Sequence, residues 1–469
     1  MPTISVWKFV DRPEAAPTVL LDMNDGDTWS VKREGFDISP PPLRRSVVSN
    51  NLMDGGTVTS TNYDLRELRF SLILSAATED GRNAQLKSLE AELAKPANLI
   101  MFQHKDSSFP VFFRTLRSDN PVYNREWAPS AWQVDCSVLA EPYAIGTRHD
   151  IVTGATVNND PAAAANPTRL DITGVRGDSP APALAQFSVA GGFNAGSTFT
   201  LAQRSHGDPT ALTLFAQAEA GALGTDTTVQ PNDADMSGAG SNFVRCTFAT
   251  DNNLTTRLTV TVPTATVASE LRGRYRVYVR LRRTGTTSAF NMRCRVGGTN
   301  PTNGPLTLWA TNMPNPLWML DLGTVDLPAA GAVPPAIGYG GQPAGFTPLT
   351  LEIQAQRTSG TSNLDIDYIY LFPADEAQCS VRQTASVGSL VIDGPNDTVY
   401  GMAAGSSPTD PVNRTIDNGG GLMPRQGGLP MLVPGTTNRW LIVRPDQFKT
   451  ATSTWSVSYW PRWREVATS

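Results

Sequence analysis

The chain has 469 residues, of which 40% are hydrophobic and 17% are charged, and its formal net charge is −5. This length is too great for one hydrophobic core and predicts roughly three domains. The acidic balance provides no basic field for nucleic acid or an anionic membrane surface, and no apolar run approaches the ~20 residues that span a bilayer. Residues 1–10 lack a basic stretch followed by an apolar core, so they predict a strand rather than a signal peptide.

Residues 1–147 are interpreted as a first module made mostly of strands. Short apolar stretches at 4–10 and 19–21 predict two strands, and the turn residues at 24–27 predict a hairpin. Over residues 64–76 the apolar side chains alternate with polar ones, which is typical of a strand with one buried face. Further strands are expected at 99–103, 111–116 and 132–140.

One helix is predicted in this module, over residues 80–95. Leu86, Leu89 and Leu93 recur at helical spacing, so they form one apolar stripe. Thr78 or Asp80 is a candidate for the N-cap, and Pro96 ends the helix. The expected architecture is therefore an N-terminal β-sandwich with one covering helix.

Residues 148–166 are interpreted as a linker because Asn, Pro and Ala dominate them without a strand pattern. Residues 167–376 then show many short alternating segments, the clearest at 273–283 and another at 364–372. Many short strands separated by turn residues predict a jelly-roll β-sandwich domain, which resembles carbohydrate-binding modules. The fold class as a whole is mainly β.

Residues 377–469 are expected to form a short C-terminal β segment that ends in a dense aromatic cluster. Trp455 and Tyr459 share one face of a predicted strand, Trp460 lies on the other, and Trp463 follows. Aromatic side chains on both faces indicate a strand buried between a core and a neighbour. We therefore predict that Trp455, Tyr459, Trp460 and Trp463 belong to a subunit interface.

No motif in the sequence predicts catalysis, a bound cofactor or a transition metal. His104, His149 and His206 are far from one another and from any cysteine, and nucleophile-elbow, zinc-protease and phosphate-loop motifs are absent. The four cysteines, Cys136, Cys246, Cys294 and Cys379, form no close pair, so isolated buried thiols are expected. A bridge between Cys246 and Cys294 is the alternative. The chain is predicted not to be an enzyme.

Two charged patterns stand out in the jelly-roll region. Asp365 and Asp367 lie two residues apart on a predicted strand, so their carboxylates share a face. A solvated strand end is the simpler interpretation and a structural calcium is the alternative, although calcium requires six to eight oxygen ligands. Arginines at 274, 276, 280 and 282 form a stripe that is expected to be the solvated face of a sheet, with contact to an acidic partner or a sugar acid as the alternative.

Trp309 and Trp318 flank a loop rich in Asn and Pro. Exposed indole rings on a jelly roll stack on the apolar faces of sugars, so these two residues are the candidates for glycan contact. Packing into the core is the competing interpretation.

The first module resembles the N-terminal domain of siphophage distal tail (Dit-like) proteins. The resemblance is carried by the strand at 64–74, the helix at 80–95, the segment Leu99–His104, and the last strand at 132–140 with its Pro142-Tyr143 exit. It covers about a third of the chain. With the jelly-roll insert, the chain looks like a minor tail protein.

This resemblance implies a structural component of a bacteriophage tail tip. It would be an adaptor ring that joins the tail tube to the hub and receptor-binding apparatus, in a virion made in the cytoplasm of the host bacterium. The ring would be sixfold, with a trimer as the alternative, and its partners would be the tail tube, tape-measure and hub proteins. The alternative function is adhesion to a host surface glycan through the jelly roll. Neither nucleic acid nor a membrane span is expected.

Overall fold

The computed structural model describes most of the chain in separate stretches. The described residues are 5–49, 56–105, 107–118, 121–128, 130–158, 169–193, 198–204, 215–237, 240–261, 273–285, 287–297, 302–309, 317–327, 350–374, 377–382, 387–403, 422–443 and 452–466. They are mainly β, as expected, and contain one α-helix. They fall into two compact units. The first comprises Met1–Asp150, Val175–Ala181 and Ser458–Ser469, and the second comprises Ile151–Gly174 and Pro182–Val457.

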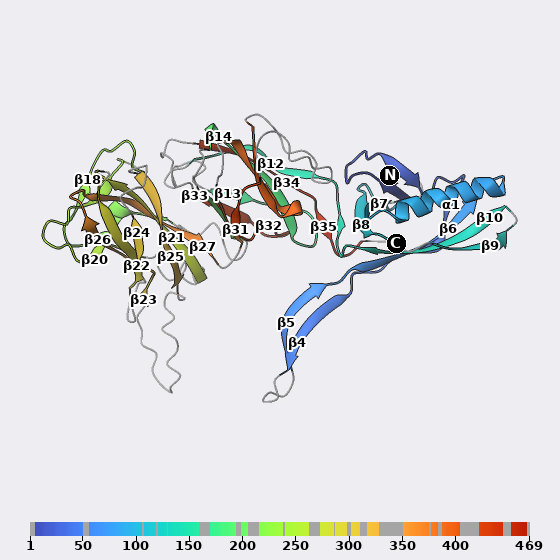
Figure 1. The fold of residues 1–469 in the computed structure, drawn as a ribbon, viewed down its shortest axis with the longest axis horizontal. Coiled ribbons are helices and arrows are strands. Elements are labelled where there is room, and N and C mark those ends of the chain that lie inside the picture. The colour runs from blue at the N-terminus through green and yellow to red at the C-terminus, as the bar shows by residue number, and fades with distance from the viewer. Residues whose placement is uncertain are drawn as a thin grey trace. The chain divides into compact units, whose positions relative to one another are not determined.

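The first unit is built around one large antiparallel sheet (Figure 1). Its strands follow the order β2 (Val19–Asp22), β1 (Val6–Val10), β7 (Ala97–Gln103), β8 (Val111–Leu116), β10 (Ala131–Ala140), β6 (Arg66–Ser75) and β3 (Trp29–Ile38). Three short strands extend it: β9 (Val122–Ala128) on β10, β11 (Ala144–Ile145) on β8, and β35 (Arg462–Trp463) on β11. Residues 462–463, near the end of the chain, therefore pair with the first module.

The two ends of this sheet lie close together. Strand β2 ends at Asp22 and β3 begins at Trp29, so only a short turn connects the outermost strands, and Trp7 of β1 stacks on Phe36 of β3. The sheet therefore curls around its core. The turn at 24–27 was predicted to close a hairpin, and this is wrong, because β2 pairs with β1 whereas β3 pairs with β6. The Asp25 carboxylate orders the turn by accepting from the amides of Asp27, Thr28 and Trp29.

The single helix, α1 (Glu79–Leu93), fills the inside of the curl. Thr78 is its N-cap and accepts a hydrogen bond from the amide of Gly81 at 3.1 Å, as the capping pattern predicts. Leu86, Leu89 and Leu93 are buried in the same core as the inward side chains of β6 and β10. The predicted helix and its apolar stripe are thus confirmed.

A hairpin of β4 (Leu43–Ser49) and β5 (Gly56–Tyr63) is a separate feature of the first unit. The two strands pair only with each other and form a two-stranded sheet of their own among the described strands. Figure 1 shows this hairpin leaving the body of the first unit as an arm.

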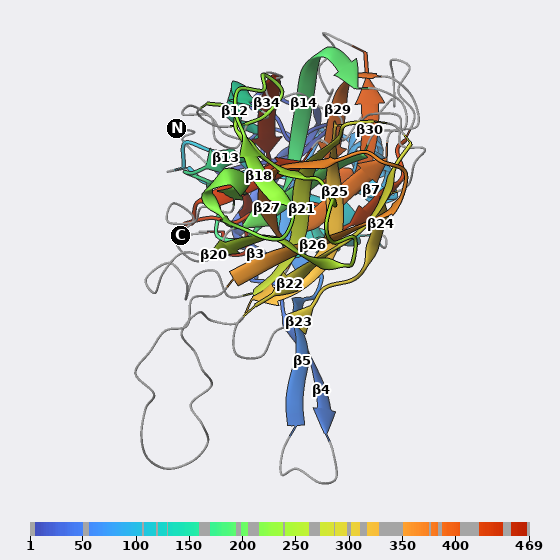
Figure 2. The same ribbon diagram turned by 90° about the vertical axis from the view of Figure 1, so that its left-hand side faces the viewer.

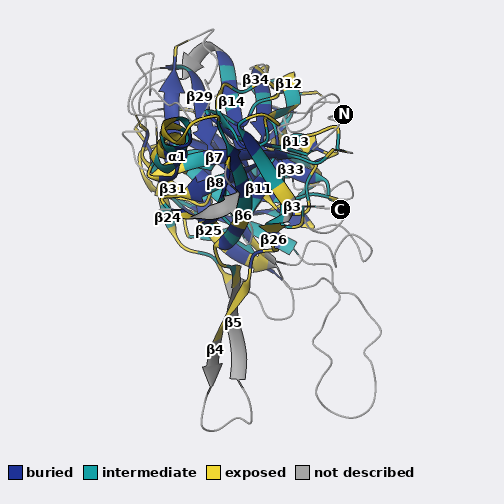
Figure 3. Ribbon diagram, turned by 90° about the vertical axis from the view of Figure 1, so that its right-hand side faces the viewer, coloured by how far each residue is buried: buried dark blue, intermediate teal, exposed yellow. Residues whose placement is uncertain are grey.

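Two of the sheets of the second unit combine strands from both ends of the stretch of chain that interrupts the first unit. One is ordered β12 (His149–Asn158), β34 (Thr452–Tyr459), β14 (Ala181–Phe193), β29 (Val387–Asp393) and β30 (Thr398–Met402), with β32 (Met431–Leu432) on β14. The other is ordered β13 (Arg169–Ile172), β33 (Asn438–Val443), β15 (Thr198–Arg204), β28 (Gln378–Arg382) and β31 (Arg425–Gly427). A short 3-10 helix, η3 (Gly394–Asn396), connects β29 to β30. Figure 3 shows β14 and β29 largely buried.

This arrangement differs from the predicted boundaries at two places. Residues 149–158 form a strand, where a linker over 148–166 was expected; residues 159–168 lie outside the described part of the chain. Strands β13 to β15 pair with strands from 378 onward, so the expected jelly-roll range of 167–376 began too early. The C-terminal segment 377–469 is shared between both units rather than forming a body of its own.

The remaining strands form two facing sheets, which we call the inserted sandwich (residues 215–373; Figure 2). The first is ordered β18 (Thr227–Gln230), β19 (Phe243–Cys246), β27 (Leu364–Pro373), β21 (Gly273–Arg283) and β25 (Leu317–Leu327), with β16 (Phe215–Gln217) on β27. The second is ordered β17 (Ala222–Leu223), β20 (Thr255–Thr261), β26 (Thr350–Ser359), β22 (Ala289–Val296) and β23 (Thr302–Asn303), with β24 (Thr307–Trp309) on β22. The 3-10 helix η2 (Ala218–Ala220) follows β16. One core lies between the sheets and includes Val277, Phe290 and Ile353.

Candidate functional site

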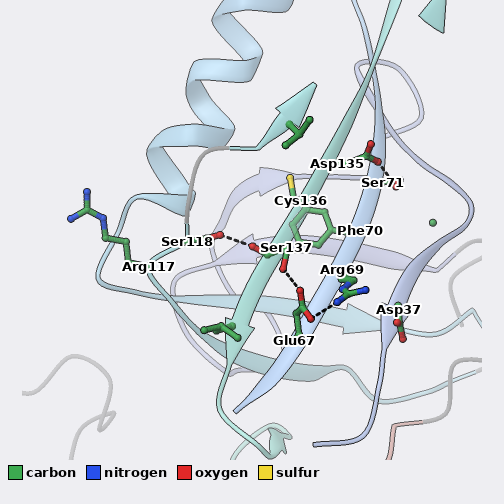
Figure 4. A pocket seen from close by; sticks show the side chains of 13 residues that line it. Asp37, Glu67, Arg69, Phe70, Ser71, Arg117, Ser118, Asp135, Cys136 and Ser137 are labelled. Carbon is green, nitrogen blue, oxygen red and sulfur yellow. Dashed lines mark hydrogen bonds and ion pairs between the residues drawn. The ribbon is translucent and has the colours of Figure 1, made fainter. Parts of the chain in front are cut away.

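A hollow lies on the open face of the first sheet, opposite the face that carries the helix. The inward residues Leu68, Leu72 and Val134 of β6 and β10 are fully buried, so the residues between them point to the other side. The cavity has a volume of about 740 Å³ and is lined mainly from β3, β6, β10 and the segment after β8. Figure 4 shows its polar side chains.

The centre of the hollow is a linked set of polar groups on β6 and β10. Arg69 Nη2 lies 2.7 Å from Glu67 Oε2, and Ser137 Oγ donates to Glu67 Oε1 at 2.5 Å. Ser118 Oγ in turn donates to the Ser137 carbonyl at 2.6 Å (Figure 4). The hydrogen bonds from Arg69 and then Ser137 lower the pKa of Glu67 to about 2, so this carboxylate is charged at neutral pH.

A second pair and an apolar rim complete the surface. Ser71 Oγ donates to Asp135 Oδ1 at 2.5 Å across the same two strands. Val122 is 72% exposed and Leu139 is 47% exposed, and both line the hollow. Exposed aliphatic side chains beside paired charges resemble the mixed composition of a protein–protein contact.

Few of the groups that line the hollow are suited to catalysis. None of the described residues that line it is a histidine, and burial raises the pKa of the Cys136 thiol to about 12, which keeps the sulfur protonated. The Glu67 and Asp135 carboxylates already accept hydrogen bonds from their neighbours. The arrangement therefore favours contact with another surface over catalysis. The sequence shows these residues only as the polar half of two alternating strands, and no pattern in it indicates a hollow.

Asp365 and Asp367 are not at a solvated strand end, which corrects that expectation. Both are fully buried on β27. Asp365 accepts from Arg245 Nε at 2.8 Å and from Arg282 Nη2 at 2.9 Å, while Asp367 pairs with Arg280. Guanidinium groups thus neutralise both carboxylates, and burial raises the pKa of Asp367 against the opposing effect of Arg280. No cluster of three or more metal-ligating side chains occurs among the described residues, and calcium stays a prediction.

The arginine stripe of β21 is paired with acids along its length and is not simply a solvated face. The ion pairs join Arg274 to Asp326 at 2.9 Å, Arg276 to Asp321 at 3.3 Å, Arg280 to Asp367, and Arg282 both to Asp233 at 2.5 Å and to Asp365 at 2.9 Å. Arg280 is buried, whereas Arg274 is exposed. Acids on three segments supply the partners, namely β25, β27 and the stretch between β18 and β19, and strand periodicity cannot reveal them.

Trp309 does not present an exposed aromatic face. Its side chain is 0% exposed and packs against Phe290, with the Arg283 guanidinium 4.8 Å from the ring centre. The competing interpretation, packing into the core, is therefore the correct one for this residue. The side chain of Trp318 lies outside the described part of the structure.

Three of the four C-terminal aromatic residues, Trp455, Tyr459 and Trp460, are buried within the chain, which corrects their prediction as an interface, whereas the prediction for Trp463 stays untested. In the second unit, Trp455 is fully buried and Trp455 Nε1 donates to Ser453 Oγ at 2.7 Å. In the first unit, the Tyr459 hydroxyl accepts from the amide of Arg176 at 2.6 Å, and Trp460 is buried. Trp463 is partly buried on β35. Period-2 alternation predicted the faces of these residues but not what covers them.

Among the described residues, the cysteines and histidines belong to no cluster that could hold a metal ion. All four cysteines are free and buried, Cys246 and Cys294 among them, so the alternative of a bridge between these two is wrong. His149 packs edge-on against Tyr459, and His206 lies outside the described residues. No helix in the described part of the chain is long and apolar enough to cross a membrane.

No family model and no curated protein sequence matches this chain. Among solved structures, the SPP1 Dit protein, described as a paradigm of the hub adsorption apparatus in phages that infect Gram-positive bacteria, aligns over 98% of this chain and 99% of its own, with a TM-score of 0.37 and 8% identity. The phage P2 baseplate, activated with Ca, aligns over 97% and 98%, with a TM-score of 0.28 and 6% identity. The same baseplate with Sr aligns over 80% and 99%, with a TM-score of 0.24 and 8% identity.

Proposed function

We propose that this chain is a structural subunit of a bacteriophage tail tip, where it forms an adaptor ring between the tail tube and the hub. The first support comes from the elements that carry the distal-tail resemblance. Strands β6, β7 and β10 belong to one sheet, and α1 packs on that sheet. The expected role is mechanical rather than catalytic.

The observation that carries the proposal is the hairpin β4–β5. It projects from the first unit and pairs with no other described strand (Figure 1). An isolated two-stranded hairpin is only marginally stable in water, because it has no second layer on which to bury its side chains. Leu43 and Arg44 at its base are exposed. A neighbouring subunit would provide the missing layer.

The open sheet face is the surface that we propose for this contact. It is separate from the hairpin and combines paired charges at Glu67 and Arg69 with exposed Val122 and Leu139. When two different surfaces of one subunit meet on adjacent copies, the contact is head-to-tail, and it closes into a ring if the rotation permits. Sixfold closure follows from the resemblance, and a trimer is the alternative. The other partners would be tail tube, tape-measure and hub proteins at the tip of the virion.

The test is negative-stain microscopy of the purified chain together with its mass from light scattering. Closed rings are expected, and their symmetry distinguishes a hexamer from a trimer. A strictly monomeric chain at high concentration, both alone and mixed with tail tubes, would contradict the proposal.

A variant tests the hairpin directly. Replacement of residues 45–61 by a Gly-Gly turn removes the arm and leaves the strands of the large sheet in place. We expect this variant to be monomeric, with the thermal unfolding of the rest of the chain unchanged. The control is Arg274→Gln, which alters an exposed arginine of the inserted sandwich and should leave the rings intact. Rings that persist without the hairpin would show that the contact lies elsewhere.

A further inference from the structure

The root of the hairpin β4–β5 is in contact with a residue near the end of the chain. Tyr63, the last residue of β5, is paired with Leu43, the first residue of β4. Arg464 Nη1 donates to the Tyr63 hydroxyl at 2.9 Å, and the guanidinium lies over the Tyr63 ring, 5.7 Å from its centre. Tyr63 also packs edge-on against Tyr143, which follows β10. Two other segments of the first unit therefore meet the hairpin at this tyrosine.

Asp178 fixes the backbone that carries Arg464. Its carboxylate accepts hydrogen bonds from the amide of Arg464 at 2.7 Å and from the amide of Glu465 at 3.1 Å. The amide of Asp178 in turn donates to the carbonyl of Arg462 at 3.0 Å. Because charge-assisted bonds hold two consecutive amides, the Arg464 side chain begins from a defined backbone position.

Gly177 shows how closely the two segments approach each other. Its backbone has a φ of +108°, and a Cβ atom at this position would lie 2.5 Å from the carbonyl oxygen of Arg462. Only glycine combines this conformation with such a close approach. We call residues 177–179 and 462–465 together the clamp.

Arg66 connects the clamp to the large sheet. It is the first residue of β6, it is almost completely buried, and its Nη2 atom donates to the carbonyl of Arg464 at 2.6 Å. The exposed ion pair of Arg44 with Asp64, also at the root of the hairpin, is long at 3.8 Å and contributes little. The clamp, rather than this surface pair, therefore relates the direction of the hairpin to the sheet.

The two halves of the clamp are continuous with two strands of the second unit. Residues 177–179 precede β14 and residues 462–465 follow β34, and these strands are neighbours in one sheet. Beside the clamp, the amide of Arg176 donates to the Tyr459 hydroxyl at 2.6 Å, so the two segments are already close where they leave these strands. Formation of that sheet therefore brings the halves of the clamp together.

We propose that the clamp is a folding checkpoint for assembly, because it sets the direction of the hairpin only after the sheet with β14 and β34 has formed. A chain in which this sheet is incomplete leaves Tyr63 without Arg464. Its hairpin then samples many directions, and contact with a neighbouring subunit costs the entropy of ordering it. Subunits with an unfinished second unit therefore enter the ring poorly. The effect on assembly rests on the proposed ring, whereas the direction of the hairpin is measurable without one.

Distances between two spin labels in the full chain measure the direction of the hairpin. The labels are attached through Ser46→Cys on β4 and Ser88→Cys on α1, which are both exposed, whereas the four native cysteines are buried. Dilution with unlabelled chain removes distances between copies. A single narrow distribution is expected for the native chain. Arg464→Gln and Tyr63→Phe should broaden it, because each removes the hydrogen bond at the root.

Asp178→Ala separates a clamp from a local contact. Asp178 bonds to the amides of Arg464 and Glu465 and not to Tyr63, so its removal broadens the distribution only if the clamp positions Arg464. If this variant does not fold, Asp178→Asn, which keeps one acceptor, replaces it. Arg148→Gln is the matched control, because it removes one charge from an exposed ion pair of the first unit and should change nothing. An unchanged distribution in Arg464→Gln or in the Asp178 variant would overturn the inference.

The same variants measure the effect on assembly. Arg464→Gln should raise the chain concentration at which half of the subunits are in rings by about tenfold, the effect of a weaker contact, with the thermal unfolding of the first unit little changed. Rings that form equally well while the hairpin distances are broadened would overturn the checkpoint. If the native chain forms no rings at all, the proposed function fails, and the spin-label distances still decide whether the clamp positions the hairpin.

Discussion

Arg66 connects three segments of the first unit that are far apart in the sequence. It lies on β6 and is almost completely buried. Its Nη2 atom donates to the Pro142 carbonyl at 2.8 Å and to the Arg464 carbonyl at 2.6 Å. The guanidinium also lies over the Phe113 ring, and burial lowers its pKa to about 10. One side chain thus holds the exit from β10 and the end of the chain against the large sheet.

We predict that Arg66→Met destabilises the first unit by about 2 kcal/mol, because two partly buried carbonyls lose a charged donor while the apolar stem is retained. Differential scanning calorimetry of the full chain measures this as a lower melting temperature for the transition of the first unit. Arg44→Met is the control, since the Arg44 side chain is largely exposed and its ion pair with Asp64 is long, at 3.8 Å. Equal effects of both changes would show that Arg66 does not connect the segments.

At the scale of elements, the sequence predicts those parts whose signal is local. The strand at 273–283 has the predicted bounds, and Thr78 caps the helix, because alternation and capping depend on neighbouring residues. The strand at 149–158 was missed because only Val157 in it is buried, so it lacks a period-2 apolar face. The buried state of Asp365 was missed because Arg245, its partner, lies 120 residues earlier. The pairing of strands that are distant in the sequence does not alter the local sequence pattern of either strand. The hollow beside Glu67 could not be predicted from the sequence for the same reason.

Helix α1 provides the test at this scale. Leu89 is fully buried within the curl of the sheet, so Leu89→Asp places a carboxylate where the surrounding side chains are apolar. We expect a loss of about 4 kcal/mol or more, enough to unfold the first unit at moderate temperature. Ser88→Asp is the matched control, because it adds the same group at an exposed position of the same helix. Thermal unfolding followed by circular dichroism distinguishes them, and a Leu89→Asp variant that melts like the native chain would exclude the packing described for α1.

At the scale of the whole molecule, the chain is a nested set of insertions. The first unit is interrupted after Asp150 and completed by Val175–Ala181 and Ser458–Ser469, and strand β35 of the latter segment pairs Trp463 with Ala144. The second unit is interrupted in turn. Strands β15 and β28 pair side by side, and the amide of Gln203 donates to the carbonyl of Ala377 at 2.9 Å. The inserted sandwich therefore leaves and re-enters at adjacent points, as in domains that are inserted with little disturbance to their host.

This geometry predicts that the inserted sandwich can be removed. Joining residue 204 to residue 377 through a short Gly-Ser loop would turn β15 and β28 into a simple hairpin, with their pairing unchanged. The host sheets should keep their fold, although Ala202 and Leu441, which pack with the core of the sandwich, would become more exposed. The excised residues 215–374 should also fold alone, because both of their sheets and the core between them are retained.

Calorimetry of the three proteins decides this prediction. The full chain should show the transitions of both pieces, each within a few degrees of its melting temperature in isolation. The loss of contacts such as that between Tyr278 and Thr200 should lower the melting temperature of each piece only slightly. If the sandwich folds alone but the shortened host does not, then the insert supports its host through Ala202 and Leu441, and the nested units form one cooperative body. If the host folds and assembles without the insert, then the first unit and its hairpin are sufficient for ring formation. The inserted sandwich would then be a module that the assembly does not require, and any ligand that it binds would be recognised independently of the ring.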